Sequence, residues 1–319
     1  MGHDQRFKEF LHAFLQDFLK LFFPRVEKRL DFQSTEFLDT EVFTELHDGR
    51  RREADVVAKL ETRDGNPKRV LIHIEIQTRP ERNLSERMAE YYSLLRSRYK
   101  LPIFPIVVYL HGGRTGPAIE EYREQLWETE FLRFRYNGVW LARLNAEEYV
   151  ERDPPAGAAL AALMDRSDKS RRRDLASLRV SMLSRVVESG LDEGRQLLLI
   201  DLIETYFPLS AEQMESYQRL VSRKEHRKVQ DVELTWAEKL MEKGRAKGRA
   251  EGRAEGRAEG RETGLIDGKR EALVSQLTAK FGPLTEGVTK HIESIDSLNT
   301  LDAMLERVLT ATSLEEMKL

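Results

Sequence analysis

Residues 54–78 read ADVVAKLETRDGNPKRVLIHIEIQT, and this stretch decides the predicted fold. The turn formers at residues 64–67 separate the segments 54–62 and 68–78, which is typical of a β-hairpin. In the second segment, the even-numbered residues from Val70 to Ile76 are all apolar. Because side chains alternate between the two faces of a strand, His73, Glu75 and Gln77 should share the opposite face.

A helix precedes this hairpin, and a helix and a strand follow it. Residues 30–46 are weakly predicted as one or two strands. The helix at 84–99 and the apolar strand at 103–110 indicate a right-handed crossover between parallel strands. A further short strand is predicted at 139–144. The first helix ends before Pro24 and has a stripe of apolar residues at helical spacing: Phe7, Phe10, Leu11, Phe14, Leu15, Phe18, Leu19 and Phe22.

The rest of the chain is predicted to be mainly helical. The pattern divides the protein into a domain at 1–150, a helical region at 151–243, a repeat at 244–268 and a small helical module at 269–319. In this module, Leu273, Leu277 and Phe281 should line a first helix that stops at Gly282. A later helix should be lined by leucines at positions 298, 301, 305 and 309.

The repeat has glycine at every fourth position from Gly244 to Gly268, and arginine follows five of these glycines. Seven glycines would cost an isolated helix about 7 kcal/mol relative to alanine. A four-residue period brings small residues close to one face, where a second helix could approach. The tract is therefore interpreted either as a helix that is firmer when paired, with self-association through the tail, or as a flexible charged linker.

Composition limits the classes of function. The 319 residues include no cysteine, which excludes disulfides and fits a reducing, cytoplasmic setting. The net charge of -3 restricts any nucleic-acid binding to local patches. The longest clearly apolar stretch, at 103–110, is far shorter than the ~20 residues that span a membrane, so no membrane partner is expected.

Two acidic side chains converge in the predicted hairpin. If the strands pair symmetrically about Gly65, residues whose numbers sum to 130 lie opposite each other, and Asp55 faces Glu75. Two carboxylates at ~4 Å repel by about 4 kcal/mol at an effective dielectric of ~20, and a cation or a shared proton would relieve this repulsion. Carboxylate oxygens suit Mg²⁺. The alternative is two carboxylates on a solvated sheet face, which the spacing alone favours.

Asp55 and the strand 72–77, which reads IHIEIQ, resemble the D…ExQ variant of the PD-(D/E)XK nuclease motif. With their flanking segments, they resemble the recombination-promoting nuclease family, also described as a PD-(D/E)XK nuclease family of putative transposases. The resemblance covers roughly residues 3–150, and residues 269–319 resemble an uncharacterised helical module found in the same proteins. The flanking features are His3-Asp4, Phe7-Lys8, the sequence 21–24, Arg87, Tyr91 and the sequence 109–112.

The resemblance implies an α/β fold with a restriction-endonuclease-like αβββαβ core and a mixed sheet, followed by helices. It also implies a Mg²⁺-dependent DNA endonuclease linked to recombination or transposition, with Mn²⁺ and Ca²⁺ as alternative ions. Asp55 and Glu75 would be the metal ligands, and the carbonyl of Ile76 is a candidate third ligand. Gln77 completes the catalytic set.

Gln77 departs from the superfamily, because most members have lysine there. Glutamine can orient water or phosphate but carries no charge. Lys59 is one candidate source of that charge, and Asp4 or Glu9 is a candidate additional acid from the first helix. His73 is interpreted as an ordinary strand histidine. The alternative function is a catalytically inactive DNA-binding or self-assembling protein with a decayed nuclease fold, and RNA remains open as a substrate.

Overall fold

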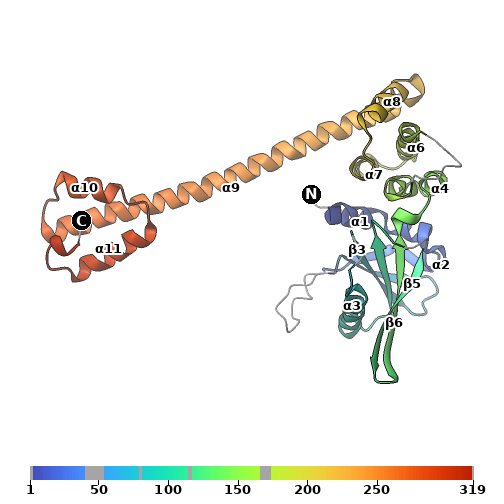
Figure 1. Cartoon of the computed structure of the whole chain (residues 1–319), viewed down its shortest axis with the longest axis horizontal. Coiled ribbons are helices and arrows are strands. Elements are labelled where there is room, and N and C mark those ends of the chain that lie inside the picture. The colour runs from blue at the N-terminus through green and yellow to red at the C-terminus, as the bar shows by residue number, and fades with distance from the viewer. Residues whose placement is uncertain (1–2, 40–53, 79–80, 114–116, 166–173, 318–319) are drawn as a thin grey trace. The chain divides into compact units, whose positions relative to one another are not determined.

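The computed structural model describes residues 3–39, 54–78, 81–113, 117–165 and 174–317 (Figure 1). The chain divides into two compact units, Met1–Ala237 and Glu238–Leu319. The first unit combines helices with a six-stranded mixed sheet, and the second is helical. The predicted α/β class with a helical C-terminal region is therefore confirmed.

The sheet has the strand order β1-β2-β3-β4-β6-β5. The pairs β1–β2, β2–β3 and β5–β6 are antiparallel, whereas β3–β4 and β4–β6 are parallel, so the predicted parallel pair is confirmed. The strands are β1 (Leu30–Phe37), β2 (Val56–Thr62), β3 (Arg69–Gln77), β4 (Ile103–Tyr109), β5 (Ala118–Leu126) and β6 (Thr129–Trp140). The predicted strand segment at 40–46 lies outside the described residues.

Helices cover both faces of the sheet. The apolar stripe of α1 (His3–Phe22) packs on the face that includes Ile72 and Ile74. The helix α3 (Leu84–Tyr99) packs on the other face, where Leu95 contacts the cluster of Val57 and Leu71. The order α1, β1, β2, β3, α3, β4 follows the predicted order, with the short helix α2 (Pro24–Glu27) added after α1.

Further helices extend the core on the α1 side of the sheet. They belong to the same apolar cluster as α1 and β3, because Tyr149, Leu183 and Leu199 are buried in it. The elements are η2 (Leu141–Arg143), α4 (Ala146–Glu151), α5 (Ala156–Leu160), η3 (Ala161–Leu163), α6 (Leu175–Val187), α7 (Glu193–Tyr206), α8 (Ala211–Val221), η5 (Lys224–His226) and the start of α9 (Arg227–Phe281).

The predicted strand at 139–144 is wrong in its bounds. Residues 139 and 140 end β6, and the following residues form the 3-10 helix η2. The strand begins at Thr129 and forms a hairpin with β5, which the sequence did not predict. The hairpin carries charged residues on both strands and is largely exposed, so it lacks the apolar alternation that identifies a half-buried strand (Figure 1).

The second unit is built around the end of α9, with α10 (Glu286–Glu293), α11 (Leu298–Thr310) and η6 (Glu315–Met317). Leu273, Leu277 and Leu301 are buried in its core as predicted, and α9 ends before Gly282, whose φ is +88°. Leu309 is 76% exposed, which corrects its predicted packing. Val308 takes the core position instead, because a step of seven residues from Leu301 stays on one helix face, whereas two steps of four drift off it.

The glycine repeat lies within α9 and is helical. A Cβ atom built at each of its seven glycines meets no atom within 4 Å. In the part of the chain that the structure describes, no segment therefore packs against these glycines.

Candidate active site

The register of the β2–β3 hairpin is the predicted one. Val56 pairs with Ile74 and Val57 with His73, so paired residue numbers sum to 130. The tight turn requires Gly65, whose φ is +67°, a conformation that side chains disfavour. This register places Asp55, immediately before β2, beside Glu75 near the end of β3.

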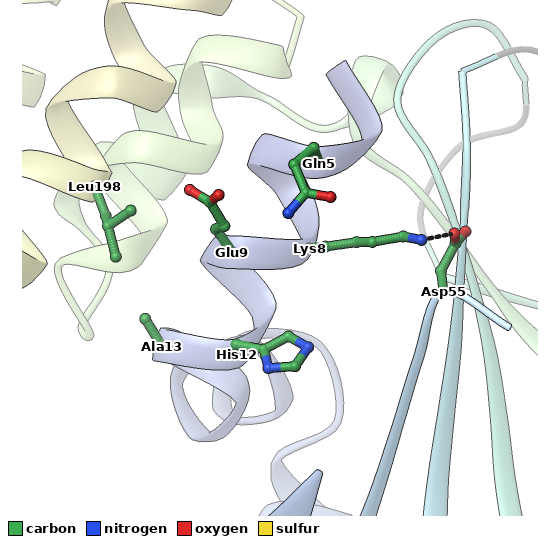
Figure 2. Close-up of a pocket in the computed structure, with 7 residues that line it drawn as sticks. All are labelled: Gln5, Lys8, Glu9, His12, Ala13, Asp55 and Leu198. Carbon is green, nitrogen blue, oxygen red and sulfur yellow. Dashed lines mark ion pairs between the residues drawn. The ribbon is translucent and has the colours of Figure 1, made fainter. Parts of the chain in front are cut away.

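Asp55, just before β2, contacts both β3 and α1. Its backbone N–H donates to Oε1 of Glu75 at 3.0 Å, and its Oδ2 accepts from the backbone N–H of Ile76 at 2.8 Å. On the other side, Nζ of Lys8 in α1 lies 2.8 Å from Oδ1 of Asp55 (Figure 2). The contacts with β3 and with α1 thus fix the aspartate at the start of β2.

Burial raises the pKa of Asp55 above its ordinary value, and repulsion by the Glu75 carboxylate raises this pKa further. The ion pair with Lys8 and the hydrogen bond from Ile76 oppose the rise only in part. The folded environment therefore disfavours the charged form of Asp55 relative to water.

Glu75 is almost completely buried, with 2% of its surface exposed. Its Oε1 lies 3.0 Å from Nε2 of His73, which is fully buried and packs edge-on against Tyr91 of α3. The same Oε1 accepts from the backbone N–H of Asp55, so it can also accept from Nε2 of His73. The sequence interpretation as a partly buried strand histidine is therefore refined, because His73 is fully buried and contacts Glu75.

Gln77 is the last residue of β3 and is 6% exposed. Strand alternation places it on the face of Glu75, as predicted. The structure therefore gathers Asp55, Glu75 and Gln77 at one end of the hairpin.

An open pocket of about 660 Å³ borders this site. Asp55 lines it, and most of the other lining residues come from α1, including Lys8 and His12. Burial lowers the pKa of His12, and the nearby Lys8 lowers it further, so its imidazole is neutral at pH 7. Glu75 and Gln77 are not among the lining residues, so the open side of the site is formed by Asp55 and α1.

The two carboxylates suit a divalent metal ion. Mg²⁺ typically takes one or two carboxylates and completes its coordination with water and substrate phosphate. The charge repulsion that raises the pKa of Asp55 is what such an ion would relieve. Within the described ranges, no group of three or more His, Asp or Glu side chains is positioned to hold a metal, so protein ligands alone would not enclose it.

Lys59, Glu9 and Asp4 are the remaining side-chain candidates from the sequence. Nζ of Lys59 lies 2.5 Å from Glu36 of β1, in a separate pocket that does not include Asp55. Glu9 lines the Asp55 pocket, but Figure 2 shows its carboxylate projecting away from Asp55. The side chain of Asp4 lies outside the described part of the structure.

Sequence reasoning assigned no role to Lys8. Phe7-Lys8 is one of the flanking features of the family resemblance, and Lys8 lies at the border of the apolar stripe of α1. Such a border position is usually solvated, and only the packing of α1 on the sheet brings the lysine to Asp55.

Comparison with known proteins identifies the family. The family described as "Putative transposase, YhgA-like" matches residues 1–188, which is more than half of the chain. The chain belongs to this family. No curated protein and no solved structure matches it.

The family description associates the chain with transposition and therefore with DNA. The matched residues include α1, the whole sheet and the Asp55 site. Of the helices that the structure describes, none combines the length and apolar character needed to cross a membrane.

Proposed function

We propose that the first unit is a PD-(D/E)XK-type, metal-dependent DNA endonuclease that acts in recombination or transposition. The observation that carries this proposal is the contact between Asp55 and Glu75 across the β2–β3 hairpin, beside an open pocket. The element order α1, β1, β2, β3, α3, β4 also supports it, since this is the order of the nuclease core that the motif implies.

In the proposed reaction, a water oxygen bonds to phosphorus while the bond from phosphorus to one sugar oxygen breaks. The attacking water releases a proton to solvent, and the departing sugar oxygen takes one up. A bound Mg²⁺ would polarise the phosphate and lower the pKa of a water molecule.

The chain's own residues have distinct parts in this proposal. Asp55 and Glu75 would hold the ion, and His73 would keep Glu75 oriented through the contact at Oε1. The Gln77 amide would orient water or phosphate through hydrogen bonds.

The test is nicking of supercoiled plasmid DNA with Mg²⁺, with EDTA as the metal-free control. We expect Asp55→Asn and Glu75→Gln to slow nicking by more than about 100-fold, because even outer partners of metal ligands typically contribute 10–100-fold. Glu61→Gln is a matched control, since Glu61 is a carboxylate of β2 that pairs with Arg69 away from the site. Absence of nicking by the unmodified protein, or equal nicking by Asp55→Asn, contradicts the proposal. A single-stranded RNA substrate in parallel tests the alternative nucleic acid.

A second candidate is a catalytically inactive DNA-binding or assembly protein. Gln77 favours it, because the charge usual at this position is missing, and so do the uncovered glycines of α9, which leave space for a second helix. The mass of the full-length protein in solution tests assembly. We expect an oligomer that dissociates when Gly252, Gly256 and Gly260 are replaced by leucine. A monomeric unmodified protein contradicts the assembly role.

A further inference from the structure

A phosphodiester nuclease needs positive charge near the phosphate, and Gln77 does not supply it. If the proposed function holds, another residue of this chain has to provide that charge. The most direct source is a cation that already touches the carboxylate pair.

Lys59 and Arg87 are two cationic side chains that pair with carboxylates other than Asp55. Lys59 is held by Glu36 at 2.5 Å, and Arg87 of α3 is held by Glu81 at 2.7 Å. Neither lines the pocket beside Asp55. Lys8 both contacts Asp55 and lines that pocket.

The position of Lys8 combines a fixed backbone with a mobile charge. The neighbouring Phe7 and, one turn further along the stripe, Leu11 are completely buried, so the first turns of α1 are held against the sheet. The Lys8 side chain is 26% exposed and reaches Asp55 along the pocket wall (Figure 2). Four methylene groups allow its ammonium to move within the pocket without any movement of α1.

We propose that Lys8 is the phosphate-directed cation of this site, supplied by α1 in place of the lysine that Gln77 replaces. In the metal-free protein, Lys8 compensates Asp55. Asp55 and Glu75 would hold a divalent ion in the active protein. The ammonium of Lys8 would then be free to turn toward a phosphate oxygen in the pocket, where it would stabilise the negative charge that builds up as water attacks.

This role has two consequences of opposite sign. Lys8 competes with a divalent ion for Asp55, so its removal should strengthen metal binding. It also contributes charge stabilisation during cleavage, so its removal should slow cleavage. A lysine that only held α1 to the sheet would not produce this opposition, because its loss would weaken metal binding and cleavage together.

The experiment uses the full-length protein and two measurements, Ca²⁺ binding by titration calorimetry and plasmid nicking with Mg²⁺. For Lys8→Met, we expect Ca²⁺ to bind about fivefold more tightly, as removal of a partly exposed ion pair implies. We expect nicking to fall about 100-fold, as for loss of one stabilising group. Lys8→Arg, which keeps the charge, should recover part of the nicking rate.

Lys20→Met is the matched control on the same helix, because Lys20 pairs with Asp153 away from the site. It should change neither measurement. If the unmodified protein nicks DNA and Lys8→Met nicks equally well, or loses Ca²⁺ affinity together with activity, the role of Lys8 is wrong while the nuclease proposal stands. If the unmodified protein neither binds Ca²⁺ nor nicks DNA, the proposed function itself fails.

Discussion

Two clusters in the first unit each combine two carboxylates with a lysine or an arginine, and they differ in where that cation lies. In the first cluster, Lys8 contacts Asp55 and borders a pocket. In the second, Arg179 of α6 contacts both Glu204 of α7 and Glu233 of α9.

The Arg179 cluster is closed. The arginine side chain is 6% exposed, and its guanidinium lies 4.6 Å from the centre of the Tyr217 ring of α8. Burial raises the pKa of Glu204, while the charge of Arg179 opposes the rise. A central, rigid cation of this kind joins four helices and leaves little room for a ligand.

The Asp55 cluster is open by comparison. Its cation is a flexible lysine at the pocket wall, with a side chain that is 26% exposed. The comparison shows that a pair of buried acids does not by itself indicate chemistry. The two sites differ in the position and flexibility of the compensating cation. A partly exposed, flexible lysine could be replaced by a metal ion, whereas a buried arginine stabilises the fold.

The largest stability effect is expected in the closed cluster. Arg179→Met leaves Glu204 and Glu233 without their cation and should lower the free energy of unfolding by about 3–5 kcal/mol. Urea unfolding of the full-length protein at neutral pH measures this change. Arg185→Met, on the same helix, removes an exposed pair with Asp153 and should cost less than about 1 kcal/mol. Equal effects of the two substitutions would remove the distinction between a central cation and a surface one.

A smaller effect of opposite sign is expected in the open cluster. Because the folded-state pKa of Asp55 is raised, its stabilising contribution is present below the ordinary carboxyl pKa of ~4 and is lost as the pH rises through the raised value. Asp55→Asn removes the charge that is unfavourable in the folded protein at pH 7, so it should raise the melting temperature of the metal-free protein at that pH. This increase in melting temperature should become smaller as the pH falls, because Asp55 itself then becomes protonated in the folded protein.

Thermal unfolding in EDTA over a series of pH values measures this difference. Added Ca²⁺ should stabilise the unmodified protein and leave Asp55→Asn unchanged. A lower melting temperature for Asp55→Asn at pH 7 would show that the charged form of Asp55 is stabilised in the folded protein, which contradicts the raised pKa.

The smallest effect is expected for Lys59→Met. Lys59 pairs with Glu36, whose side chain is 56% exposed, so its loss should change the free energy of unfolding by less than about 1 kcal/mol. The nicking rate should stay within about twofold, because this lysine does not reach Asp55. A loss of nicking comparable with that of Lys8→Met would mean that the site draws its charge from β2 rather than from α1.

The sequence by itself determined the hairpin, its register and the acidic pair. Strand side chains alternate with a period of two, and Gly65 fixes the turn, so Asp55 and Glu75 are neighbours whatever the rest of the chain does. Leu309 and the exposed β5–β6 hairpin show the limits of such patterns, because drift around a helix and polarity on both faces of a strand conceal the true element.

Only the tertiary structure decided which basic side chains form ion pairs with these carboxylates. Lys8 and Arg179 lie far along the chain from their partners, and no local period relates them to Asp55, Glu204 or Glu233. The packing of α1 on the sheet, and of α6 on its neighbouring helices, brings each pair together, because burial of apolar stripes sets the positions of the polar residues at their borders.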